Sequence, residues 1–93
     1  MGGHRIIDQQ RRQWAREEAD RRLTRDQRAR IVAAGRERDA ALAALAEEDR
    51  ANAPDPSDVT AVERWMAASE VRAREIHAHF YEAERIVRAG ASK

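Results

Sequence analysis

The chain has 93 residues, of which 38% are charged and 4% aromatic, and 20 of its hydrophobic residues are alanine. Such a chain forms one small domain, residues 1–93, with a thin core. The absence of cysteine excludes disulfides, Cys-based zinc sites and thiol catalysis. No apolar stretch reaches the length of a signal peptide or a membrane span, which predicts a cytoplasmic protein with no membrane partner.

Charge is unevenly distributed along the chain, although the net charge is only +1. Residues 1–36 carry ten arginines and five acidic residues, whereas residues 37–58 carry two arginines and seven acidic residues. Residues 59–93 are nearly balanced. A basic first third and an acidic middle favour an association in which opposite ends meet. The alternative is a solvated helix surface on which charges of one sign happen to cluster.

The first expected helix covers residues 5–22. Its apolar residues form only a thin stripe, and the next residues, Thr24 to Gln27, match a capping box that starts a new helix. Two interpretations therefore remain: a separate first helix that folds back, or one continuous helix over residues 5–50. The poor apolar pattern around Gly35 and Arg38 favours the break.

A second helix is expected over residues 25–50, with Ile31, Ala34, Arg38, Ala41 and Leu45 at approximately heptad spacing. The segment 51–57 then contains both prolines of the chain, Pro54 and Pro56. Proline lacks a backbone donor and fixes φ, so this segment is a loop. A connection this short places the flanking helices antiparallel.

The third expected helix, residues 58–89, has the clearest pattern. Asp55 or Ser57, or Thr60 with Glu63, would cap its start, and Gly90 would cap its end. Trp65 and Ile86 lie beside the heptad positions and widen the apolar stripe, as in a bundle of three or four helices. Residues spaced alternately by three and four form the seam, namely Val59, Val62, Met66, Ser69, Ala73, Ile76, Phe80, Ala83 and Val87.

Together these elements predict an all-α protein: an antiparallel helical hairpin of two or three helices with coiled-coil-like packing, completed as a bundle by oligomerisation. The expected function is a non-enzymatic, self-associating protein–protein interaction module that acts as an adaptor, regulator or assembly factor. Its partner would be a second copy, as in a homodimer, or another helical protein. The predicted interaction seam comprises Val59, Val62, Trp65, Met66, Ile76, Phe80, Ile86 and Val87.

The alternative function is association with nucleic acid through the Arg-rich segment 11–36. Arg21, Arg25 and Arg28 share one helical face, and arginine suits phosphate contact. Acidic residues interrupt this patch, and the net charge is below that of a typical nucleic-acid-binding domain.

Catalytic and metal sites are not predicted. On a helix, His77 and His79 face opposite sides and cannot chelate one ion together. No nucleophile constellation or phosphate-binding loop is present in the sequence, so no cofactor, small-molecule substrate or enzymatic activity is expected. If Met1 is removed, Gly2, Gly3 and His4 could bind copper or nickel in a square plane, and a remnant of cloning explains the same residues.

Overall fold

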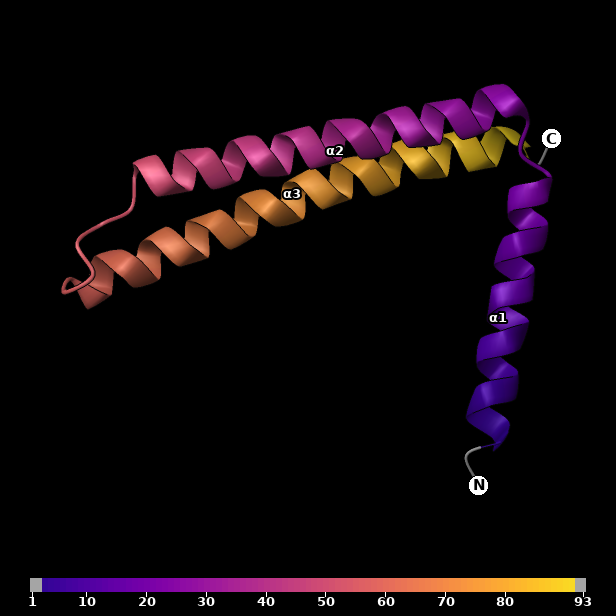
Figure 1. Ribbon diagram of the computed structural model, residues 1–93, viewed down its shortest axis with the longest axis horizontal. Coiled ribbons are helices and arrows are strands. Elements are labelled where there is room, and N and C mark those ends of the chain that lie inside the picture. The colour runs from indigo at the N-terminus through magenta and orange to yellow at the C-terminus, as the bar shows by residue number, and fades with distance from the viewer. Residues whose placement is uncertain (1–2, 92–93) are drawn as a thin grey trace.

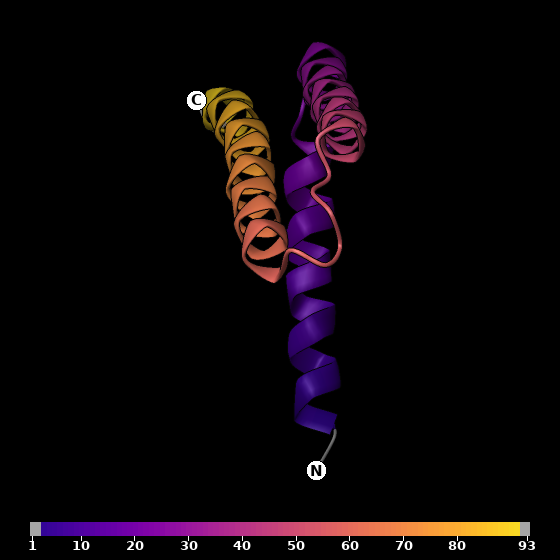
Figure 2. The same cartoon turned by 90° about the vertical axis from the view of Figure 1, so that its left-hand side faces the viewer.

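In the computed structural model, which describes residues 3–91 and the side chains of residues 7–90, the chain is all-α (Figure 1). The helices are α1, Gly3–Arg21, α2, Arg25–Ala51, and α3, Val59–Ala91. α2 and α3 pack side by side and antiparallel, which confirms the predicted helical hairpin (Figures 1 and 2). No helix of the described chain is long and apolar enough to span a membrane.

The chain breaks between α1 and α2 at Arg22, Leu23 and Thr24, so residues 5–50 do not form one continuous helix. Thr24 adopts an extended backbone with φ −70° and ψ 163°. Its hydroxyl accepts a hydrogen bond from the Gln27 backbone N–H at 3.1 Å, and the Gln27 side-chain oxygen accepts one from the Thr24 N–H at 2.8 Å. This reciprocal pair is the capping box that the sequence predicts, and it starts α2 as a new helix.

The capping of α3 differs from the sequence-based expectation. Asp58 caps its start, because its carboxylate accepts a hydrogen bond from the Ala61 N–H at 3.1 Å. The Asp55 carboxylate instead accepts bonds from the Ser57 N–H and hydroxyl, which stabilise the loop. Gly90 does not end the helix, since α3 continues to Ala91 and no described glycine has a positive φ.

Packing between α2 and α3 buries little side-chain surface. Leu45 of α2 and Phe80 of α3 are 6% and 9% exposed, and Leu23 at the break is 8% exposed. No described side chain is completely shielded from solvent. The facing residues of α2 are half-buried at near-heptad spacing, as predicted: Ile31, Ala34, Arg38 and Ala41. The two helices of the hairpin therefore pack through a narrow apolar seam.

α1 leaves the hairpin at the end opposite the proline loop and projects away from it (Figures 1 and 2). Apart from polar contacts of its last turn, it packs against neither α2 nor α3 along its described length. The Cα radius of gyration is 18.9 Å, whereas a compact domain of this length would have a radius of roughly 12 Å. The single chain is thus an open, angular molecule.

Candidate interaction surfaces

The predicted interaction seam divides into a part that faces α2 and a part that faces solvent. Phe80 is buried, and Val62, Trp65, Ile76 and Val87 are half-buried along the hairpin. By contrast, Val59, Met66 and Ile86 are 65%, 56% and 58% exposed. Within one chain α2 therefore covers only part of the apolar surface of α3.

Trp65, rather than Met66, faces α2 near the proline loop. Its indole N–H donates to the backbone carbonyl of Asp49 at 3.2 Å, and the hydroxyl of Ser69 donates to the carboxylate of the same aspartate. These bonds join the last turn of α2 to the first turns of α3, and Met66, which the heptad pattern places in the seam, is 56% exposed. The heptad spacing places Ser69 in the apolar seam, and in the structure its hydroxyl makes a polar contact with α2 instead.

An ion pair extends this polar contact along the outside of the hairpin. The guanidinium of Arg72 lies 2.7 Å from the carboxylate of Glu48. The hydrogen bond and the positive charge of Arg72 lower the pKa of Glu48 from its usual value of 4.5. Both side chains are about half exposed, so the pair contributes to the alignment of the helices more than to stability.

Two residues of α2, Gly35 and Arg38, surround Phe80 in the hairpin. The guanidinium of Arg38 lies over the Phe80 ring, 4.3 Å from its centroid, as a cation–π contact. Gly35 lies beside the same ring, with the Phe80 Cε2 atom only 3.8 Å from where a Cβ would stand. The sequence places Arg38 at a heptad position of α2, but both residues weaken the apolar pattern there, and no local pattern shows that they cover an aromatic ring.

A groove runs along one side of the hairpin, between α2 and α3. Its volume is about 440 Å³. Five apolar residues line it: Ala34, Ala41, Ile76, Phe80 and Ala83. Charged and polar side chains border them, namely Glu37, Arg38, Arg72, Glu75 and His79.

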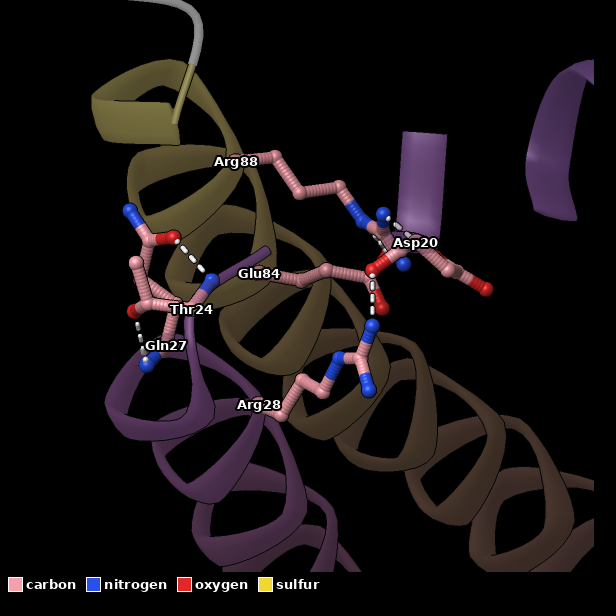
Figure 3. A network of polar contacts seen from close by, with 6 residues as sticks. All are labelled: Asp20, Thr24, Gln27, Arg28, Glu84 and Arg88. Atoms are coloured by element: carbon pink, nitrogen blue, oxygen red, sulfur yellow. Dashed lines mark hydrogen bonds and ion pairs between the residues drawn. The ribbon is translucent and has the colours of Figure 1, made fainter. Parts of the chain in front are cut away.

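Polar contacts fix the position of the last turn of α1 on the hairpin (Figure 3). The carboxylate of Asp20 pairs with the Arg88 guanidinium at 2.8 Å, and the backbone carbonyl of Asp20 accepts a hydrogen bond from Arg28 at 2.8 Å. Arg88 also lies 3.8 Å from Glu84, one turn earlier in α3. One residue of α1 is thereby tied to both helices of the hairpin.

The three arginines predicted to contact a polyanion do not share one helical face. Arg21 ends α1, whereas Arg25 and Arg28 belong to α2, and the break at residues 22–24 separates them. Arg21 lies 3.8 Å from Glu17, and Arg28 is bonded to the Asp20 carbonyl. The prediction that these arginines share one helical face is therefore wrong, because the capping box at Thr24 separates Arg21 from Arg25 and Arg28.

The apolar residues of α1 lie in solvent. Trp14 is 64% exposed and Ile7 is 48% exposed, and every other described α1 side chain is exposed as well. The apolar stripe of this helix therefore has no partner within the described chain, whereas Leu23, just beyond the end of α1, is buried.

Within the described residues, no group of three or more histidine, cysteine or acidic side chains is placed to hold a metal ion. His77 and His79 are both exposed on α3. His4, for which the sequence raised a copper or nickel site, lies outside the described side chains.

The helices and their packing define an all-α hairpin protein with a third, projecting helix. Comparison of the chain with protein-family models, with curated proteins and with solved structures finds no match.

Proposed function

We propose that the protein is a non-enzymatic helical interaction module of the cytoplasm, which self-associates and acts as an adaptor, regulator or assembly factor. The observation that carries this proposal is the amount of apolar helix surface without an intrachain partner. Trp14, Val59, Met66 and Ile86 are all more than half exposed, and they lie on two helices. Single exposed apolar residues are common on protein surfaces. This chain exposes several large apolar side chains although only three are buried among its described residues, which favours a binding partner that covers them.

Surface area supports the same conclusion. The accessible surface is 7935 Å² for a chain of 10.6 kDa, whereas a compact monomer of this mass would expose about 5,500 Å². The excess is larger than the roughly 1,600 Å² that a stable protein–protein interface buries in total. Association of two copies would remove part of this excess and complete a helical bundle.

The test is light scattering of the purified chain over a range of concentrations from nanomolar to high micromolar. We expect the mass to rise from that of one chain to that of two, with little dependence on salt because the interface is largely apolar. A chain that remains a well-folded monomer at every concentration would contradict self-association.

A second candidate function is nucleic-acid association, and one observation favours it. Arg11, Arg12, Arg16 and Arg25 form no ion pair with any described residue, so their guanidinium groups are free to contact phosphate. Affinity for a short DNA duplex that falls steeply as salt rises would support this candidate. A lack of binding at low salt would exclude it.

A further inference from the structure

One face of α1 combines an apolar stripe with an unpaired positive charge. Ile7 and Trp14 are seven residues apart, which places them on the same side of the helix, roughly 10 Å apart along its axis. Arg11 lies between them in sequence and close to the same side, and it forms no ion pair with a described residue. This face is apolar in the middle and basic at one edge.

The groove between α2 and α3 has the complementary character. Ile76 and Ala83 line it at the same seven-residue separation as the stripe of α1, with Phe80 between them. At its border, Arg72 is already paired with Glu48, and Arg38 lies over Phe80 and 3.1 Å from Asp39. Glu75 interacts electrostatically with Arg72, whereas Glu37 forms no ion pair with a described residue, so Glu37 is the negative charge left unpaired at the border.

We propose that the groove is occupied by α1 of a second copy of this chain, with Trp14 against Ile76 and Phe80 and with Arg11 near Glu37. This inference rests on the proposed self-association and specifies its contacts. Exchange of α1 between two copies would give each copy a third helix on its hairpin, so that two three-helix units form one dimer.

The occupant is a second copy, and not the chain's own α1, because the junction directs α1 away from the groove. Asp20 is bonded to Arg28 of α2 and to Arg88 of α3, and only three residues connect α1 to α2. Folding back within one chain would break both contacts and bend this short connection sharply. Short connections under such strain favour exchange between chains over closure within one.

Disulfide trapping tests the proposal directly, because the chain contains no cysteine. One tagged chain carries Gln10→Cys, beside the stripe of α1, and a second chain with a different tag carries Glu37→Cys, at the border of the groove. We expect a cross-linked heterodimer after mixing and mild oxidation. Val32→Cys replaces Glu37→Cys in the control, because Val32 is 53% exposed and lines a different hollow of the hairpin.

The double variant Gln10→Cys/Glu37→Cys distinguishes exchange from closure. A cross-link within one chain at low concentration would show that α1 folds back on its own hairpin, and it would overturn the proposal. If light scattering shows a dimer but the Val32→Cys control cross-links as well as Glu37→Cys, the proposed groove is wrong while self-association stands. If the chain is monomeric throughout, the proposed function itself fails.

Substitution of Trp14 by a smaller residue gives a second measurement that does not depend on cross-linking. Trp14→Ala is expected to raise the dissociation constant of the dimer at least tenfold, and Trp14→Phe is expected to raise it less. Since Trp14 is 64% exposed in the single chain, both variants should keep the helical content of the natural protein. An unchanged dissociation constant for Trp14→Ala would overturn the role of α1 as the occupant of the groove.

Discussion

Phe80 shows how individual residues compensate for a sequence with few large apolar side chains. The absence of a side chain at Gly35 lets the ring lie close to the backbone of α2. The guanidinium of Arg38 covers the face of the ring. The aliphatic stem and delocalised charge of arginine allow it to cover an aromatic face while it stays in contact with water. Tyr81 adds an edge-on contact, with ring centroids 5.5 Å apart.

The environment of Gly35 leads to a prediction about stability. Gly35 lies within α2 without a positive φ, and an added Cβ would stand 3.8 Å from Phe80 and 3.9 Å from Arg38, which are ordinary contact distances. Gly35→Ala should therefore raise the free energy of unfolding by about 0.5–1 kcal/mol, because alanine lowers the entropy cost of helix formation. Urea denaturation at fixed protein concentration measures the change.

Gly90→Ala is the matched control for this substitution. Its Cβ would also find ordinary contact distance, 3.8 Å from the Gln27 amide, but Gly90 lies one residue from the end of α3. Helix ends fray, so the gain there should be smaller. A loss of stability in Gly35→Ala would show that Phe80 needs the space that glycine leaves.

At the scale of the helices, the start of α2 separates the chain into an arm and a hairpin. Two hydrogen bonds between Thr24 and Gln27 satisfy backbone N–H groups that have no partner within the helix. The same break lets Asp20 reach Arg28 and Arg88, so the local capping signal and the contacts between helices reinforce each other.

Thr24→Ala should consequently lower the free energy of unfolding by about 1 kcal/mol, since the hydroxyl acceptor of the capping box is lost. Thr24→Ser retains the hydroxyl and should lose much less. Thermal or urea unfolding followed by circular dichroism compares the two variants. Equal losses in both would mean that the methyl group of Thr24, and not its hydrogen bond, stabilises the break.

At the scale of the whole molecule, stability is expected to be distributed unequally. α2 and α3 support each other along the hairpin, whereas the 19 residues of α1 pack against no other helix in the described chain. In proteins most of the stability of a helix comes from packing of its apolar face against other elements, and α1 lacks that packing. The arm should therefore be the least stable part of a single chain.

Hydrogen exchange read out by mass spectrometry tests this expectation. In a dilute, monomeric sample, the amides of α1 should exchange much faster than those of α2 and α3. As protein concentration rises and copies associate, the protection of α1 should increase more than that of the hairpin. Strong protection of α1 in a monomer would show that it packs on its own chain.

Several features of the fold follow from the sequence alone, because local chemistry determines them. The two prolines stop α2 and make a loop, the Thr24–Gln27 pair starts a new helix, and apolar spacing places Ile76, Phe80 and Val87 on the facing side of α3. Periodicity and capping involve residues only a few positions apart, so they can be recognised before the fold is known.

The tertiary structure decided which apolar residues find a partner and which do not. Trp65 bonds to Asp49 of α2, whereas the neighbouring Met66 is exposed. Arg38 covers the ring of Phe80. Asp20 pairs with Arg88 where α1 leaves the hairpin. Each of these contacts joins residues that are far apart in the sequence, and their geometry depends on how whole helices lie against each other. No local pattern carries that information, since the same residues at the same spacing are compatible with several arrangements of the helices.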